Sequence, residues 1–270
     1  MHARPILGVA AGFAVAFFGL APETVQPDLR ANAAPSARVA APVASDEELL
    51  QIIATLDSGL AAPHEPARWL SRAKTALWTF TRQLQARSVG RDQEALVLRH
   101  LDDVGRRYPA TAPAVAQARR IVTTLTVGKV APEIVGHDLD GRPMKLSDYR
   151  GRVVVLAFSG HWCGICRSDC PYDRQLLERH GASGFALVGV NSDPDPAMAR
   201  TAYQHNGLTF PSFWDGPRGG PIATAWDVIG WPTVYVLDAQ GVIRFVDLRK
   251  EQLLNGVGEL LAEAATVDRP

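Results

Sequence analysis

The spacing of apolar residues along the chain changes near residue 127. From residue 45 to residue 126, apolar residues recur every three or four positions among polar ones, which is the period of an amphipathic helix. Ser45 followed by Glu48 predicts a capping box at the start of the first helix. Residues 45–126 are therefore predicted to form a small all-α region of three or four helices, whose role stays open. Trp69 and Trp78 fall within these helical runs, and we expect both to belong to the core.

From residue 127 onward, short apolar runs alternate with helical patterns. The runs Val153–Phe158 and Phe185–Val190 carry no polar side chain, which is typical of strands buried on both faces. Further strands are predicted at Thr233–Leu237 and Val242–Val246, and an N-terminal β extension around the turn Asp138–Gly141. Helices are predicted at Gly164–His180, Pro196–Asn206 and Gln252–Ala265, with a short one ending near Trp226–Val228. This order predicts an α/β fold with a mixed central sheet and helices on both faces.

The first 33 residues resemble an export signal. Arg4 precedes an apolar run over residues 6–21, which is shorter than the roughly 20 residues that a membrane-spanning helix needs. Small residues at 31–33 offer a cleavage site, and an uncleaved N-terminal anchor is the alternative. Both interpretations predict that the rest of the chain lies outside the cytoplasm, periplasmic or secreted, with membrane attachment through residues 6–21 in the second case. Residues 34–44 are rich in Ala, Pro and Val and are predicted to be a linker.

Charge and cysteine content narrow the function further. The chain has 28 basic and 28 acidic residues and no basic patch, so we expect no nucleic-acid partner. All three cysteines lie between positions 163 and 170. A disulfide scaffold joins distant loops, which three cysteines in one short segment cannot do. The cysteines therefore indicate a reactive site.

The pair Cys163 and Cys166 follows a buried strand and begins a predicted helix. Two intervening residues allow one disulfide to close across the first helical turn. Cys163 would lie at the helix N-terminus, where free N–H groups and the helix dipole stabilise a thiolate. Because the thiolate is the attacking form in disulfide exchange, Cys163 is predicted to attack and Cys166 to resolve the mixed disulfide.

The three cysteines allow two other interpretations. A structural zinc site would need two more ligands, and Cys170 and His161 are the neighbouring candidates. No second pair of ligands at zinc spacing occurs in the sequence, so we expect no metal and no cofactor. Inert buried cysteines are the other alternative, and Trp162 at a strand–helix junction fits that interpretation poorly.

The segment from Trp162 to Cys166 (WCGIC) resembles the W-C-G-P-C motif of the thioredoxin superfamily, and most closely the extracytoplasmic TlpA/ResA-type and redoxin-domain proteins. Other segments agree in order and spacing: Gly128–Glu133, Leu146–Gly151, Val188–Asn191, Ile229–Thr233 and Val236–Gly241. The resemblance implies a thioredoxin-like fold over residues 127–270, a thiol–disulfide oxidoreductase activity, and supporting roles for Trp162, Gly164, Trp231 and Pro232. It also implies a cis bond before Pro232, which leaves the Trp231 backbone free to pair with an extended substrate.

Three departures from the motif concern the redox chemistry. Ile165 replaces the usual proline between the cysteines, and this dipeptide helps to set the redox potential. Ala157 stands where cytosolic thioredoxins carry an acid, so Asp169, where these relatives often carry Glu, is our candidate proton acceptor for Cys166. Cys170 is extra. It is either a small buried apolar residue or the partner of Cys166 in an alternative disulfide, which a regular helix would strain.

The leading hypothesis is a thiol–disulfide oxidoreductase that reduces protein disulfides and receives electrons from a membrane-bound thiol reductant. A peroxiredoxin-like peroxidase is one alternative, although Gly160 stands where that family needs Thr or Ser. A Sco-like copper-binding module is another, because Cys166–Pro171 resembles its C-x-x-x-C-P motif, although no histidine follows His205. An interaction role for residues 45–126 is the third. The substrate, the direction of electron flow and the oligomeric state stay open.

Overall fold

A computed structural model describes residues 43–61, 66–181 and 184–267 of the chain. The predicted leader (1–33) and nearly all of the predicted linker (34–44) lie outside the described residues. All described residues belong to one compact unit, Ala37–Pro270. Within the described ranges, no helix is long and apolar enough to cross a membrane.

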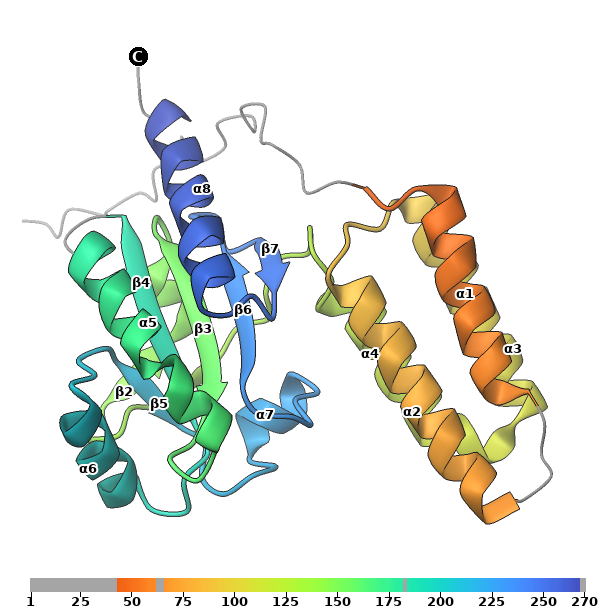
Figure 1. Cartoon of the computed structure of the whole chain (residues 1–270), viewed down its shortest axis with the longest axis horizontal. Coiled ribbons are helices and arrows are strands. Elements are labelled where there is room, and N and C mark those ends of the chain that lie inside the picture. The colour runs from red at the N-terminus through yellow and green to blue at the C-terminus, as the bar shows by residue number, and fades with distance from the viewer. Residues whose placement is uncertain (1–42, 62–65, 182–183, 268–270) are drawn as a thin grey trace, which may run out of the picture. The chain divides into compact units, whose positions relative to one another are not determined.

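The helical region contains four α-helices (Figure 1): α1 (Asp46–Leu60), α2 (Pro66–Gln85), α3 (Arg91–Arg107) and α4 (Ala112–Thr124), with a 3-10 turn at Pro109–Thr111. The predicted capping box is confirmed, because the Glu48 N–H donates to Ser45 Oγ at 3.1 Å and the Ser45 N–H donates to the Glu48 carboxylate at 2.9 Å. Buried side chains from all four helices, including Leu56, Leu77, Leu101 and Val122, form one apolar core.

The two tryptophans of α2 have different environments. Trp69 packs against this core, and its indole N–H donates to the Leu60 carbonyl at 3.1 Å. Trp78 is 48% exposed, so the expectation that it belongs to the core is wrong. The reason is its position on the helix: α2 turns Leu77 and Phe80 fully inward, and Trp78 lies beside the resulting apolar stripe.

The C-terminal region is built on a five-stranded sheet with the order β5-β4-β3-β6-β7. The strands are β3 (Val153–Ser159), β4 (Phe185–Asn191), β5 (Ser212–Trp214), β6 (Thr233–Leu237) and β7 (Ile243–Val246). The pairs β3–β4 and β4–β5 are parallel, whereas β3–β6 and β6–β7 are antiparallel. The predicted mixed sheet is confirmed, and β5 is the strand that the sequence did not predict.

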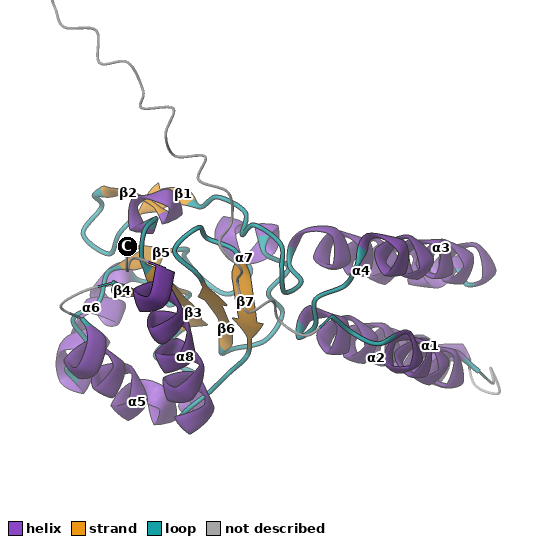
Figure 2. Ribbon diagram, turned by 90° about the horizontal axis from the view of Figure 1, so that it is seen from above, coloured by secondary structure: helices purple, strands orange, loops and turns teal. Residues whose placement is uncertain are grey.

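Alternate residues of β3 face two different cores, as expected for a strand buried on both faces. Val153 and Val155 pack with Leu176 of α5 (Gly164–His180) and Leu253 of α8 (Glu251–Val267). On the other face, residues such as Phe158 pack against the end of α7 (Pro221–Ala225) and the β1–β2 hairpin (Val135–His137, Pro143–Lys145). Figure 2 shows α5 and α8 on one side of the sheet and α7 with the hairpin on the other. Helix α6 (Pro196–Asn206) lies beside β5.

Polar contacts join the helical region to the central strands. Gln85 at the end of α2 donates through Nε2 to the Tyr235 hydroxyl on β6 at 3.1 Å, and both side chains are buried. The Val127 N–H donates to the Gln85 carbonyl at 3.1 Å. Arg120 of α4 donates through Nε to the Asp227 carboxylate at 3.1 Å. Residues from α2 and α4 are therefore held against β6 and the loop that precedes it.

Two helical glycines allow a matched test of the packing between α1 and α2. A Cβ at Gly59 would lie 2.5 Å from the Ala76 Cβ, whereas a Cβ at Gly258 in α8 would meet nothing within 4 Å. Alanine in place of helical glycine adds about 1 kcal/mol of stability where space allows. We expect Gly258→Ala to be stabilising by about that amount in urea unfolding, and Gly59→Ala to be destabilising because the two helices must separate. Equal effects of the two substitutions would contradict the close approach of α1 and α2.

Candidate active site

The predicted cysteine pair lies at the start of α5, after the short loop that follows β3. Cys163 is the N-cap residue of α5, and Gly164 opens the helix as the sequence predicted. Cys163 and Cys166 form a disulfide with a Cα–Cα distance of 5.2 Å. The Cys166 N–H donates to Cys163 Sγ at 3.1 Å. The N-terminal sulfur therefore receives one of the free backbone donors of the helix.

The electrostatic surroundings of Cys163 favour a negative charge on its sulfur. The first turn of α5 carries no acidic residue. It does carry Arg167, whose guanidinium contacts the His161 carbonyl beside the pair. Helix dipole, backbone N–H and guanidinium all stabilise a thiolate. His161 itself is exposed, and Ile165 stands 56% exposed between the two cysteines, where it can contact an incoming substrate.

Trp162 and Trp231 flank the disulfide, and both are fixed by the end of β4. The Trp162 indole N–H donates to the Ser192 carbonyl and the Trp231 indole N–H donates to the Ser192 hydroxyl, each at 3.1 Å. Their ring centroids are 5.5 Å apart at 70°. Asp193, which is buried, accepts the His161 N–H at 2.8 Å. Sequence reasoning missed Ser192 and Asp193, although polar residues after a parallel strand at the site edge were the available signal.

The loop before β6 lies against the cysteine pair. The Trp231–Pro232 bond is cis, as the resemblance implied. The Trp231 carbonyl oxygen lies 3.6 Å from Cys163 Sγ. In the disulfide form that sulfur carries no proton, so this is a contact rather than a hydrogen bond. Ile229, two residues earlier, is 59% exposed.

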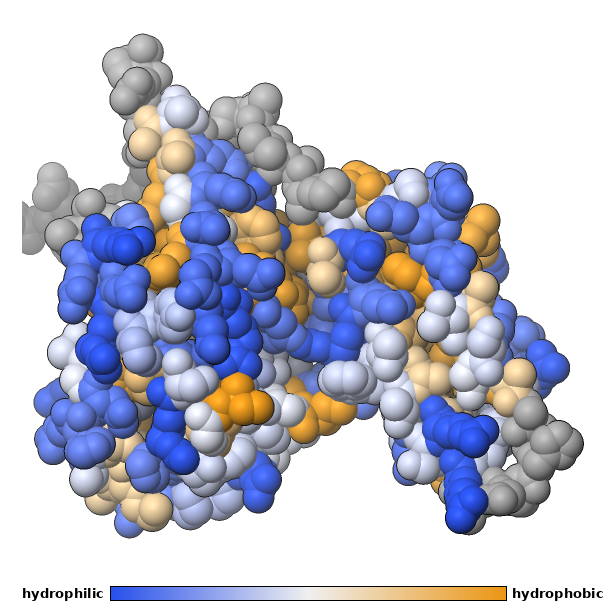
Figure 3. Space-filling view, viewed as in Figure 1, coloured by the Kyte–Doolittle hydropathy of each residue, from blue (hydrophilic) through white to orange (hydrophobic). Residues whose placement is uncertain are grey.

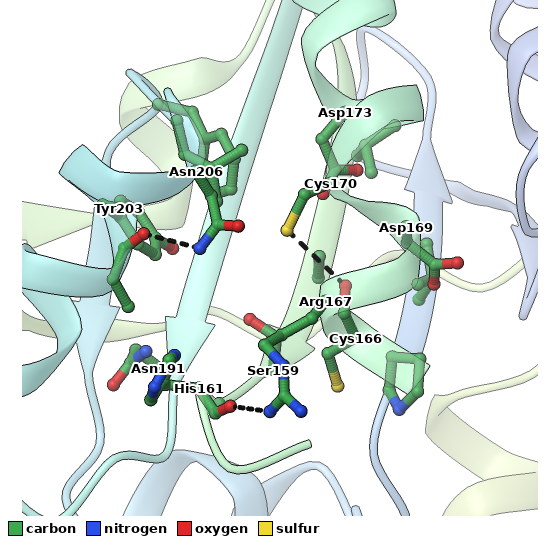
Figure 4. Close-up of a pocket in the computed structure, with 18 of the residues that line it drawn as sticks. Ser159, His161, Cys166, Arg167, Asp169, Cys170, Asp173, Asn191, Tyr203 and Asn206 are labelled. Atoms are coloured by element: carbon green, nitrogen blue, oxygen red, sulfur yellow. Dashed lines mark hydrogen bonds between the residues drawn. The ribbon is translucent and has the colours of Figure 1, made fainter. Parts of the chain in front are cut away.

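Behind the disulfide lies a small cavity of about 60 Å³, large enough for one or two water molecules, which reaches from Cys166 along the inner face of α5 (Figure 4). Cys170 is a buried free thiol on this face, one turn beyond Cys166, with its Sγ 3.7 Å from the Cys166 carbonyl oxygen. Burial raises the pKa of the Cys170 thiol, so it stays protonated at neutral pH. The α-helix continues through Pro171, and Cys170 forms no disulfide here.

Asp169, the predicted proton acceptor, lies at the edge of this cavity and is engaged by a cation. Arg249, two residues before α8, donates through Nε to Asp169 Oδ2 at 2.8 Å. The other carboxylate oxygen, Oδ1, is buried and has no hydrogen-bond partner among the described residues. Asp169 therefore has an acceptor atom without a partner on the residue one helical turn beyond Cys166, and Arg249 forms an ion pair with its other oxygen.

A second carboxyl on the same face was missed by sequence reasoning. Asp173 lies seven residues, or two helical turns, beyond Cys166 and also lines the cavity (Figure 4). Burial, with a further contribution from the Asp169 carboxylate, raises the pKa of Asp173 to about 7. Such a group binds and releases a proton near neutral pH. The spacing of Cys166, Cys170 and Asp173 at i, i+4 and i+7 was the signal that the sequence offered.

No metal-binding arrangement accompanies the cysteines in the part of the chain that the structure describes, where no three His, Cys, Asp or Glu side chains are grouped to hold an ion.

Comparison with known proteins gives consistent matches. Residues 127–246 match the AhpC/TSA family. The chain is similar to the thiol-disulfide oxidoreductase ResA of Geobacillus thermodenitrificans (strain NG80-2), with 34% identity over 122 residues that cover 45% of this chain and 69% of that protein. It is 29% identical to ResA of Bacillus thuringiensis subsp. konkukian (strain 97-27) over 137 residues, which cover 51% of this chain and 78% of that protein.

Among solved structures, a putative thiol:disulfide interchange protein DsbE from Chlorobium tepidum is 28% identical and has a TM-score of 0.46, with 52% of this chain and 99% of that chain covered. The family match begins at residue 127, so the helical region lies outside it.

The raised pKa of Asp173 predicts how stability depends on pH. The folded state holds this proton up to about pH 7, whereas the unfolded state releases it near pH 3.9. Folding therefore loses stability as pH rises from about 4 to about 7, and Asp173→Asn removes that loss. We expect D173N to exceed wild type by about 1 to 3 kcal/mol in urea unfolding at pH 8, with little difference at pH 4.

The control is Glu178→Gln, which neutralises an exposed carboxylate on the same helix. It should change stability little at either pH. A D173N protein that is less stable than wild type at pH 8 would show that the carboxylate, and not the neutral acid, is the form the fold prefers.

Proposed function

This chain belongs to the ResA-like thiol–disulfide oxidoreductases of the thioredoxin superfamily, and on that premise we propose that Cys163 and Cys166 exchange disulfides with protein substrates, in the reducing direction and outside the cytoplasm. The observation that carries the proposal is the placement of Cys163 at the N-cap of α5, where its sulfur accepts the Cys166 N–H at 3.1 Å. That contact stabilises the attacking thiolate.

The proposed reaction begins with the reduced pair. The Cys163 thiolate attacks one sulfur of a substrate disulfide, and the other substrate sulfur leaves as a thiolate. The Cys166 thiol gives up its proton and attacks Cys163 Sγ, which releases the second substrate sulfur and closes the Cys163–Cys166 disulfide. Two electrons pass from the enzyme to the substrate. A thiol reductant, proposed to be membrane-bound, must then reduce the pair again by the same exchange.

The cavity residues supply a place for the Cys166 proton. The free Oδ1 of Asp169 accepts it first in this scheme, because Asp169 lies one turn from Cys166. Asp173 supports the transfer through cavity water, since its pKa of about 7 lets it exchange protons with the solvent. Cys170 takes no part in the exchange, because its thiol is buried and burial disfavours its thiolate.

The proposed location rests on the N-terminal sequence. An apolar run at residues 6–21 after Arg4 is suited to export or to membrane attachment. Disulfide exchange needs substrate disulfides, and these persist in oxidising compartments outside the cytoplasm.

The roles of the three cysteines predict three different phenotypes. Cys163→Ser should lower the rate of substrate reduction at least a thousandfold, because the attacking thiolate is gone. Cys166→Ser should accumulate a mixed disulfide between Cys163 and the substrate, visible on a non-reducing gel. Cys170→Ser is the matched control and should retain activity within about twofold. Loss of activity in C170S together with retention in C163S would overturn the proposed roles.

A redox titration tests the pairing without a substrate. After equilibration in defined thiol/disulfide buffers, alkylation and mass spectrometry should show Cys163 and Cys166 changing together, with about 30 mV for each tenfold change in the ratio. The measured midpoint then decides whether the protein is nearer to thioredoxin-like reductants (about −270 mV) or to strong oxidants (about −120 mV). Pairing of Cys166 with Cys170 alone would contradict the mechanism.

A further inference from the structure

A groove of about 450 Å³ lies between helices α2 and α4 and the loop that carries Trp231. Its walls are formed by residues of the helical region and of the C-terminal region. Trp78 and Leu77 of α2 and Ile121 of α4 form one side, and Ile229 and Trp231 form the other. The groove has room for one large side chain or two small ones.

Each wall of the groove carries a large apolar side chain that is exposed to solvent. Trp78 is 48% exposed and Ile229 is 59% exposed. The exposure of Trp78 is not required by folding, because α2 buries its apolar stripe through Leu77 and Phe80. Apolar residues are visible on the molecular surface over the N-terminal end of α5 and the loop after α7 (Figure 3). Exposed apolar surface that borders a groove is typical of a binding site.

The groove opens beside the sulfur that would hold the substrate. Trp231 lines the groove, and its carbonyl oxygen lies 3.6 Å from Cys163 Sγ. An extended chain advances by roughly 3.3 Å per residue. Two or three residues of extended chain therefore span roughly 7 to 10 Å, counted from the sulfur along the side of Trp231.

Most charged residues that line the groove are paired with an opposite charge within the protein. This pairing affects which kind of substrate side chain the groove accepts. Arg82 forms an ion pair with Asp247, and Asp227 pairs with Arg120. The remaining cation at the wall is Lys74, to which no acidic partner is assigned among the described residues. An apolar side chain meets apolar walls there, whereas a lysine or arginine would meet the unmatched charge of Lys74.

We infer that this groove binds an apolar side chain of the substrate polypeptide, two or three residues from its reacting cysteine, and that Trp78 is a specificity-determining residue. The inference rests on the proposed function, because that function supplies the substrate. It assigns to the helical region one wall of the substrate site. The Arg120–Asp227 pair acts as a positioning contact, since it holds α4 against the loop.

The test compares two disulfide-linked peptides that differ only at the position two residues from the cysteine, with leucine in one and lysine in the other. We expect the full chain to reduce the leucine peptide with about tenfold higher kcat/KM, mainly through KM. Trp78→Ala should lower kcat/KM for the leucine peptide by about tenfold and bring the ratio of the two peptides close to one. Leu50→Ala is the matched control, because Leu50 is 58% exposed on α1 and outside the groove. It should keep the wild-type ratio.

An equal rate for both peptides with the wild-type protein, or an unchanged ratio in W78A, would overturn the inference. Reduction of oxidised glutathione by the wild-type protein separates this failure from failure of the proposed function, because that small disulfide does not reach the groove. If no disulfide is reduced, binding of cysteine-free peptides still decides the question by tryptophan fluorescence: the leucine form should bind wild type at least tenfold more tightly than W78A. A dimer in sedimentation that W78A dissociates would show a second copy of this chain in the groove and would also overturn the inference.

Discussion

The structure depends on the burial of β3 on both of its faces. Val153 and Val155 belong to one core and Phe158 to the other, so neither face of the strand can turn to solvent. This fixes where β3 ends and where α5 begins. The parallel neighbour β4 ends at the same edge, since Ser159 pairs with Asn191. The antiparallel neighbour β6 begins there, since Phe158 pairs with Thr233. Three segments distant in sequence therefore meet at the cysteine pair.

The two sulfur atoms of the disulfide lie in different electrostatic environments. Cys163 lies at the positive end of α5, with Arg167 in the first turn, and this favours a thiolate at the surface. Cys166 faces inward to carboxyls on the same helix, Asp169 and Asp173. Burial raises the pKa of Asp173 to about 7, so this carboxyl holds a proton at a pH where an exposed one would not. Cys163 thus lies where a negative charge would be stabilised, whereas Cys166 lies beside carboxyls that can exchange protons.

The sequence predicted those features whose cause is local. The capping box at Ser45, the doubly buried strand and the cysteines at a helix start each follow from residues close together in the chain. The sequence did not predict β5, because three residues carry no periodicity and the strand exists through its pairing with β4. The Arg249–Asp169 pair joins residues 80 positions apart, so no spacing rule reaches it. The exposure of Trp78 likewise depends on which neighbours surround α2.

The attachment of the helical region explains how it can influence the site without taking part in the chemistry. A buried hydrogen bond from Gln85 to Tyr235 joins it to β6, the strand that begins two residues earlier at Thr233. Arg120 holds the loop that leads into the same strand. A shift of α2 or α4 would therefore be transmitted to the position of Trp231, which touches Cys163 Sγ. Because the cysteines and carboxyls lie on α5, we expect substitutions on α2 and α4 to change the position of this loop and to leave the thiol site itself in place.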